Sequence, residues 1–274
     1  MPNAPLRPHS MAMCAALVLA VACGGHGPAA VRRSVGKIVI TATGDAQADA
    51  RTFLAQLCAT PIGGELNFMV WEGYTDSLFT APFERACGVK VNATYMGSSD
   101  DLVAKLRGGG VQTIDLISPS SDAVTQIIQA GLASPLDRSR IPSFGDLMAS
   151  FRALSVARKD TVVYGEPWAF GPNPLIYDTT KVTPAPTSWA VLWDDRFKGR
   201  ISLQDDIASL YMVAQLLGLD DPKDPAKLYN LSDAELAQVK AKMLELRPRV
   251  RKYWATAGDL TQLFQGGEVV MAEG

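Results

Sequence analysis

Short apolar runs and stretches with helical spacing alternate along most of this chain. Runs rich in β-branched and aromatic side chains predict buried strands, and the segments between them repeat apolar residues every three or four positions, as amphipathic helices do. The predicted strands cover residues 66–71, 89–95, 114–119, 199–206 and 268–274. The predicted helices cover residues 98–110, 121–132, 231–248 and 260–267, with one more running through Phe79 and Glu84 and another starting at Thr187 or Ser188.

Strand–helix alternation of this kind predicts right-handed βαβ units and a mainly parallel sheet covered on both faces. Such sheets bind ligands beyond the carboxyl ends of their strands. Trp71 and the turns at residues 95–99 and 118–121 all follow predicted strands, so we expect them to line one mouth. Residues 162–178 are strand-like but interrupted by three prolines, which favours a segment that crosses between two lobes over a central strand.

The first residues carry the pattern of an export leader. An apolar run at residues 11–22 is too short to span a bilayer and ends in Ala-Val-Ala, a small-x-small cleavage pattern. We therefore predict a signal peptide at residues 1–22 and a mature protein in the periplasm. Cys23 directly follows the cleavage point in a context that resembles a bacterial lipoprotein box, which makes Cys23 a candidate site of lipid anchoring.

Residues 23–65 are predicted to be a spacer followed by a strand–helix piece, with the strand at 37–44 and the helix at 45–59. The sequence assigns this piece no role. Cys58 and Cys87 are the two cysteines beyond the cleavage point. An oxidising compartment would allow them to pair, but two separate buried thiols fit the sequence equally well.

Composition narrows the classes of function. The 274 residues are 47% hydrophobic and 20% charged with a formal net charge of −2, which is ordinary for a globular protein and shows no basic footprint for nucleic acid. The only histidines are His9, in the leader, and His26, in the spacer. The predicted folded region therefore cannot build a Ser-His-Asp triad, a Cys-His pair or a histidine zinc site.

An ordered set of motifs runs through the region after the spacer. In sequence order it reads VWEGY, AKLRGGG with IDLISPSS, QAGLASPLD, YGEPWAFGPNPLIYD, SWAVLWDDRFKGRISLQDD and FQGGEVVMAEG. This set resembles the bacterial spermidine/putrescine-binding family of extracytoplasmic solute receptors for ABC importers. The resemblance implies a two-lobed α/β fold of the type II periplasmic-binding kind, with lobe 1 at 66–171 and lobe 2 at 172–274. It also implies a monomer that acts with a membrane permease, without a cofactor and without catalysis. Members of that family continue beyond this point, so the chain is expected to be truncated at its C-terminal end, within the return crossover.

Several residues match the family's ligand pocket. Polyamines need carboxylates for their ammonium groups and aromatic faces along their carbon chains. The matching positions are Trp71, Tyr74, Ser120, Ser121, Asp122 and Asp206. Trp168, which flanks the crossover, and Trp254 are further candidates, since each is placed to reach the cleft. Glu72 is a further candidate, although the family places its carboxylate one position later, where this chain has Gly73. Ser209 stands where the polyamine pattern has a second acid.

Other interpretations of the same residues stay open. Trp71 and Tyr74 are also suited to packing at a strand end, and residues 120–122 to capping a helix. Backbone N–H groups at such a cap favour anions, so a receptor for another small solute, such as an aminophosphonate, a carboxylate or ferric ion, is the alternative. A more distant alternative is an exported hydrolase with Glu72 or Asp206 as general acid or base.

Overall fold

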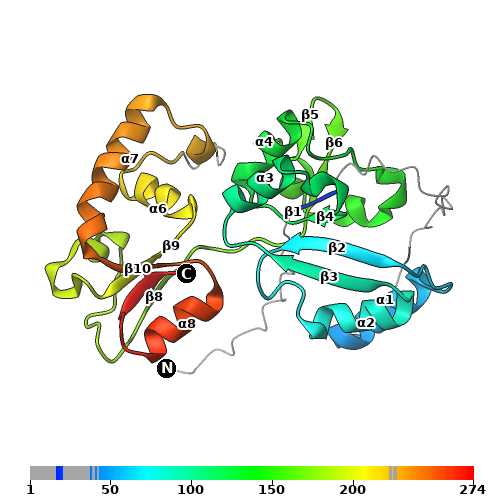
Figure 1. Ribbon diagram of the computed structural model, residues 1–274, viewed down its shortest axis with the longest axis horizontal. Coiled ribbons are helices and arrows are strands. Elements are labelled where there is room, and N and C mark those ends of the chain that lie inside the picture. Colours follow the sequence, from blue (N-terminus) through cyan, green and yellow to red (C-terminus); the bar gives the residue numbers. More distant parts are fainter. Residues whose placement is uncertain (1–16, 21–37, 39–40, 42, 222–223, 225–226) are drawn as a thin grey trace, which may run out of the picture.

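The computed structural model describes residues 17–20, 38, 41, 43–221, 224 and 227–274. Two lobes, each built on one sheet with helices on both faces, lie side by side and are joined by extended chain (Figure 1). The first sheet has the strand order β3-β2-β4-β1-β7 and the second has the order β10-β9-β11-β8. The predicted two-lobed α/β architecture is therefore confirmed.

The first lobe follows the predicted alternation closely. Its parallel strands β2 (Glu65–Val70), β3 (Lys90–Tyr95) and β4 (Leu116–Ile117) are connected through helices α2 (Ser77–Cys87) and α3 (Ser99–Arg107), and α4 (Ser121–Gln129) follows β4. Helices α3 and α4 pack on the face of the sheet that contains Met69 and Ile117, where Leu102, Leu106 and Ile127 are fully buried. This core holds the carboxyl ends of β2 and β4 in place.

Two further strands complete the first sheet. Strand β7 (Gly165–Pro167) lies at its edge, and β1 (Leu17–Ala20) lies between β4 and β7, antiparallel to both. Strand β1 falls within the segment predicted as the export leader. Cys23 and the spacer at residues 24–36 lie outside the described residues.

The second lobe is also a sheet with helices on both faces, but its sheet has fewer strands. Strands β9 (Ile201–Gln204), β10 (Val250–Trp254) and β11 (Met271–Glu273) are parallel, and β8 (Leu175–Tyr177) runs antiparallel to β11. Helices α6 (Ala208–Leu216) and α7 (Asp233–Leu246) cover one face and α8 (Ala257–Gln265) lies on the other (Figure 1). The predicted capping box at the start of α7 is present, with Ser232 and Glu235 bonding each other's backbone N–H groups.

Short elements fill the connections. They are α5 (Ala149–Arg152), the two-stranded sheet of β5 (Arg158–Lys159) and β6 (Val162–Val163), and 3-10 turns at Gly110–Gln112, Arg138–Arg140, Pro142–Asp146, Asp195–Phe197, Lys227–Tyr229 and Arg247–Arg249. Among the described helices none is long and apolar enough to cross a membrane.

Three predicted elements differ in the structure. The helix expected from Thr187 or Ser188 is a 3-10 turn at Trp189–Trp193, begun by the Ser188 side chain, which accepts a hydrogen bond from the Ala190 N–H at 3.2 Å. The strand expected at 37–44 lies partly outside the described residues, and those of its residues that are described form no strand. The stretch at 162–178 is divided into β6, β7 and β8, since its prolines cannot donate to a ladder.

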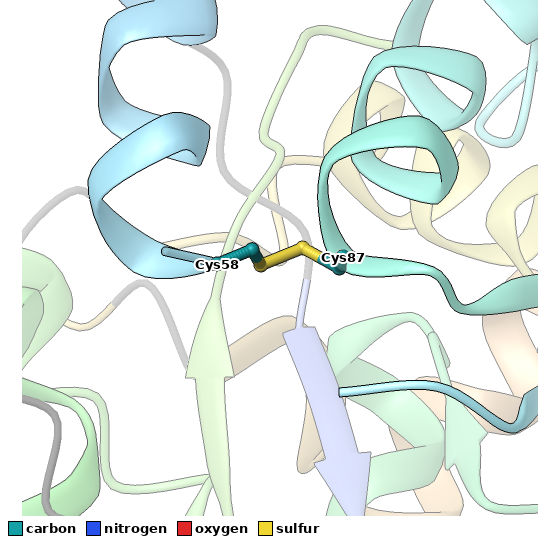
Figure 2. The surroundings of a disulfide bond; sticks show 2 residues. All are labelled: Cys58 and Cys87. Atoms are coloured by element: carbon teal, nitrogen blue, oxygen red, sulfur yellow. A yellow bond between two sulfur atoms is a disulfide. The ribbon is translucent and has the colours of Figure 1, made fainter. Parts of the chain in front are cut away.

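A disulfide bond between Cys58 and Cys87 fastens the segment before the first lobe to that lobe (Figure 2). Cys58 follows helix α1 (Ala46–Leu57), which begins at the N-cap Asp45, and Cys87 ends α2. Both cysteines are buried beside Val89, at 5% and 0% exposure. The sequence left open whether Cys58 and Cys87 pair, and the structure shows that they are bonded to each other. Helix α1 is thus part of the first lobe's outer face.

Removing this disulfide is expected to release α1. A covalent link across 29 residues reduces the freedom of the unfolded chain and contributes roughly 3 to 4 kcal/mol in the chain-entropy view. The double variant Cys58→Ser, Cys87→Ser should melt at a lower temperature and be cut by protease near residues 45–60. Reductant should lower the melting temperature of the wild type and leave the double variant unchanged. Equal melting of both proteins without reductant would show that the bond contributes nothing.

Candidate ligand-binding cleft

A cavity of about 660 Å³ lies between the two lobes. Its walls come from the ends of β2 and β4, from the extended chain between β7 and β8, and from the turn and helix after β9. Carboxyl ends of parallel strands are where α/β sheets place their ligands. The lining residues are Trp71, Tyr74, Pro119, Ser120, Ser121, Asp122, Ala169, Phe170, Gly171, Pro172, Asn173, Trp189, Gln204, Asp206, Ala208, Tyr211, Met212, Gln215, Leu228 and Tyr229.

The lobes touch across this cavity. The backbone N–H of Ser99, in the first lobe, donates a hydrogen bond of 3.2 Å to Oδ2 of Asp206, in the second. Gly97 lies against Ala255 so closely that a Cβ at Gly97 would sit 3.5 Å from the Ala255 side chain. The structure is therefore of a form in which the lobes are closed on each other at this rim.

Two carboxylates from opposite lobes carry the charge of the cavity. Asp122 lies in the first turn of α4, and Asp206 precedes α6, where its Oδ1 accepts a hydrogen bond of 3.0 Å from the Ala208 N–H. Burial, followed by the negative charge of Asp206, raises the pKa of Asp122 to about 6. The lining residues of the described chain include no Lys, Arg or His. The cavity is thus electronegative, and an incoming cation would relieve the repulsion between the two acids.

Two tyrosines form an aromatic wall beside these acids. The rings of Tyr211 and Tyr229 pack edge to face with centroids 5.1 Å apart. Burial and then the negative charge of Asp122 raise the pKa of both hydroxyls, so both remain neutral hydrogen-bonding groups. Neutral aromatic faces next to carboxylates suit a ligand with a cationic group on a carbon chain.

Most of the predicted site residues meet at this cavity. Trp71 and Tyr74 follow β2, the two serines and Asp122 follow β4, and Asp206 follows β9. The predicted residues that line it are Trp71, Tyr74, Ser120, Ser121, Asp122 and Asp206. Strands β2 and β4 are neighbours in the first sheet, and the end of β9 in the second lobe borders the same cavity, so these residues come together although more than a hundred residues separate the first from the last.

Three predicted residues lie elsewhere. Trp168 lies next to Tyr74. Its ring packs edge to face on the Tyr74 ring, and its Nε1 donates a hydrogen bond of 3.1 Å to Ser118 Oγ. Glu72 is exposed, and its Oε1 would lie 4.0 Å from a Cβ built at Gly258, in the first turn of α8. Trp254 is buried, and its Nε1 donates 3.0 Å to the backbone carbonyl of Glu273. None of the three is among the lining residues.

Several lining residues were not singled out from the sequence. Tyr211 and Met212 face the cavity from α6, Tyr229 faces it from a loop, and Asn173 faces it from the crossover. Trp189 both packs on the second lobe's core and lines the cavity. The sequence feature that could have identified Tyr211 is its position just over one helical turn after Asp206, which precedes α6. For Asn173, it was a polar side chain between two prolines in the crossing segment.

Two α/β lobes that close on a cavity at their strand ends define a ligand-binding protein of the hinged, two-lobed class. The family model for bacterial extracellular solute-binding proteins matches residues 79–274, and the chain belongs to this family.

Curated relatives agree with this assignment. The spermidine/putrescine-binding periplasmic protein 1 of Haemophilus influenzae is 26% identical over 238 residues, which cover 85% of this chain and 62% of that protein. The gamma-aminobutyric acid-binding protein of Pseudomonas aeruginosa is 28% identical over 199 residues, which cover 72% and 53% of the two chains. The resemblance to spermidine/putrescine-binding receptors seen in the sequence is confirmed. The chain spans less than two thirds of the length of either relative.

A solved structure has the same fold. The Tp0655 (TpPotD) lipoprotein of Treponema pallidum superimposes with a TM-score of 0.64 at 24% identity, over 77% of this chain and 63% of that one.

Replacing Asp122 with Asn is expected to stabilise the ligand-free protein at neutral pH. The folded state raises the pKa of Asp122 above its ordinary value of 3.8, so the stability tied to its proton is present below that value and lost as the pH rises to about 6. The neutral amide avoids this loss. Asp122→Asn should therefore unfold at higher temperature than wild type at pH 7.5, with a gain of roughly 1 to 3 kcal/mol, and match it near pH 4.

An exposed acid next to Asp206 in the sequence offers a matched control for Asp122→Asn. Asp205 directly precedes Asp206 but is not a lining residue. Asp205→Asn should change the melting temperature little at either pH. A wild type as stable as Asp122→Asn at pH 7.5 would contradict the electrostatic description of the cavity.

Proposed function

We propose that this protein is the extracytoplasmic solute-binding component of an ABC importer and that it binds a small linear amine of the polyamine class by lobe closure. The observation that carries the proposal is the pair Asp122 and Asp206 in a cavity whose lining residues include no basic side chain. The relatives named for spermidine and putrescine binding support the same ligand class.

The geometry suggests how an amine is held. An ammonium group between Asp122 and Asp206 would neutralise two acids that repel each other in the empty cavity. The carbon chain would then lie along the aromatic side chains of Trp71, Tyr211 and Tyr229. Each contact of a cation with an aromatic face contributes roughly 0.5 to 2 kcal/mol. Charge therefore selects the ligand, and the aromatic wall adds affinity.

Lobe closure follows from the same arrangement. Asp122 belongs to the first lobe and Asp206 to the second, so a cation between them connects the lobes. The Ser99–Asp206 hydrogen bond already links the two lobes at the edge of the cavity. Binding of this kind is reversible and leaves the ligand chemically unchanged.

Location and partners follow from the proposed class. The predicted leader at residues 1–22 would export the chain, and Cys23 would anchor it if lipidated. The protein would then act as a monomer that delivers its ligand to an ABC permease. The Cys58–Cys87 disulfide is consistent with an oxidising compartment.

A second candidate is a receptor for another small solute. Ser120 and Ser121 begin α4 at the wall of the cavity, and Ser120 makes no side-chain capping bond there. A helix N-terminus of this kind suits a carboxylate, and one relative is named for gamma-aminobutyric acid. An exported hydrolase that uses Asp122 and Asp206 as an acid and base pair would instead turn its ligand over.

Binding titrations test the ligand class directly. The panel is putrescine, spermidine, gamma-aminobutyric acid, an aminophosphonate and ferric ion, followed by tryptophan fluorescence and calorimetry. Putrescine or spermidine should bind saturably, and Asp206→Asn should weaken that binding by about tenfold or more, since hydrogen bonds to charged groups are the strong ones. Asp205→Asn should bind as wild type does. A response confined to gamma-aminobutyric acid, the aminophosphonate or ferric ion would move the assignment to the second candidate, and release of a chemically altered ligand would establish an enzyme.

The binding should also depend on pH. An ammonium group requires the ionised form of Asp122, whose pKa in the empty cavity is about 6. Amine affinity is therefore expected to fall as the pH drops from 7.5 to 5, and Asp122→Asn should bind weakly with little dependence on pH over that range. Wild-type affinity that is constant between pH 5 and 7.5 would rule out Asp122 as a ligand for the cation.

A further inference from the structure

A buried acid lies directly behind the cavity wall and has no part in the binding described so far. Glu273, at the end of β11, is 0% exposed. Its Oε1 accepts a hydrogen bond of 3.0 Å from Nδ2 of Asn173, a lining residue, and its Oε2 is within hydrogen-bond distance of Ser209 Oγ. Glu273 therefore touches both the crossing segment and helix α6.

The hydroxyl of Ser209 identifies the protonation state of this acid. Ser209 Oγ lies next to two acceptors, Glu273 Oε2 and the backbone carbonyl of Gln204 at 3.0 Å, but it has only one hydrogen to donate. The carbonyl cannot donate. If Glu273 were ionised, one of the two contacts would bring acceptor oxygens together without a proton. A proton on Oε2 satisfies every group, since Glu273 then donates to Ser209 and Ser209 donates to Gln204.

We propose that Glu273 is a positioning residue that holds a proton and orients Asn173, so that Asn173 presents an uncharged acceptor to the cavity. The inference rests on the proposed function and names the ligand more closely. Among the lining residues, Asp122 and Asp206 supply the counter-charge, and the part of the amine that meets Asn173 is recognised by uncharged hydrogen-bonding groups.

The orientation of Asn173 follows from the same hydrogen bonds. One N–H of its NH2 group donates to Glu273, which fixes the amide so that Oδ1 and the second N–H are left for a ligand. An oxygen acceptor at this end can bind a hydroxyl, an amide or an ammonium group, but it adds no counter-charge. Ser209, where the polyamine pattern has an acid, does not supply one either, because its hydroxyl is used by Gln204 and Glu273.

The surroundings of Glu273 support the protonated form. The described groups that face it are Asn173 from the crossover, Gln204 and Ser209 from β9 and α6, Trp254 from β10, and Asp206. Only Asp206 is charged among them, and its charge is negative. Burial raises the pKa of Glu273, and hydrogen bonding with Ser209 and with the Gln204 backbone offsets this rise only in part.

Stability measurements test the proton without any ligand. In Glu273→Gln, the amide copies the protonated acid by donating to Ser209 and accepting from Asn173. This variant should be at least as stable as wild type at pH 7, and its advantage should grow at pH 9, because a raised pKa means that wild-type stability falls as Glu273 ionises. Both proteins carry Asp122, so its contribution cancels in the comparison at each pH. Glu273→Ala should be less stable at both pH values.

Glu268→Gln serves as the matched control, because Glu268 is an exposed acid paired with Arg251. It should show no advantage that grows with pH. A Glu273→Gln variant less stable than wild type at pH 7, with the deficit shrinking at low pH, would mean that Glu273 is ionised and would overturn the proposal.

Binding measurements test the consequence for the ligand. Putrescine and 4-amino-1-butanol have the same carbon chain, but the second ends in a neutral hydroxyl group. Wild type should bind them within about tenfold of each other, and Glu273→Gln should bind both as wild type does. A preference of wild type for putrescine larger than tenfold overturns the proposal. If Glu273→Gln then lost that preference, Glu273 would be identified as a second counter-charge. If a cooperatively folded wild type binds no amine, the proposed function fails, and the stability comparison still decides the protonation of Glu273.

Discussion

The placement of two carboxylates, one from each lobe, at a single cavity where Asp122 is largely buried is the constraint that shapes the binding site. Asp122 and Asp206 each follow a strand and stand at the beginning of a helix, one in each lobe. The helix N-termini favour negative charge, whereas burial and mutual repulsion oppose it, and the pKa of Asp122 rises as a result. A cation between them would satisfy both helices and both acids at once. The empty cleft is thus less stable than the same fold would be without these charges.

The extended chain between β7 and β8 does two things at once. It connects the lobes, and its residues 169–173 form part of the cavity wall. A movement of the lobes must therefore move part of the wall. The contact of Asn173 with Glu273 ties this segment to the last strand of the second lobe. The wall and the hinge are one structural unit, which is why a buried acid outside the cavity can influence what the cavity binds.

Sequence reasoning found the lining residues at the ends of predicted strands and missed those that come from helix α6, a 3-10 turn and the crossover. Trp71 and Asp206 stood out because they follow predicted strands, and residue type at a strand end is visible in the sequence. Tyr229 and Asn173 come from a loop and from an irregular crossover, where no periodicity indicates a direction. Trp254 shows the opposite case, since it ends β10 as Trp71 follows β2, yet its indole is turned into the core toward the carbonyl of Glu273.

The sequence by itself determined the alternation of strands and helices in both halves of the chain and where most of the helices begin. These features depend on hydrophobic periodicity and on helix capping, and both are set by residues close together in the sequence. Only the tertiary structure decided that Cys58 pairs with Cys87, that Asp122 faces Asp206, and that Ser209 lies between Gln204 and Glu273. Each of these depends on bringing segments together through space, where burial and charge act on groups whose separation along the chain gives no information about their distance.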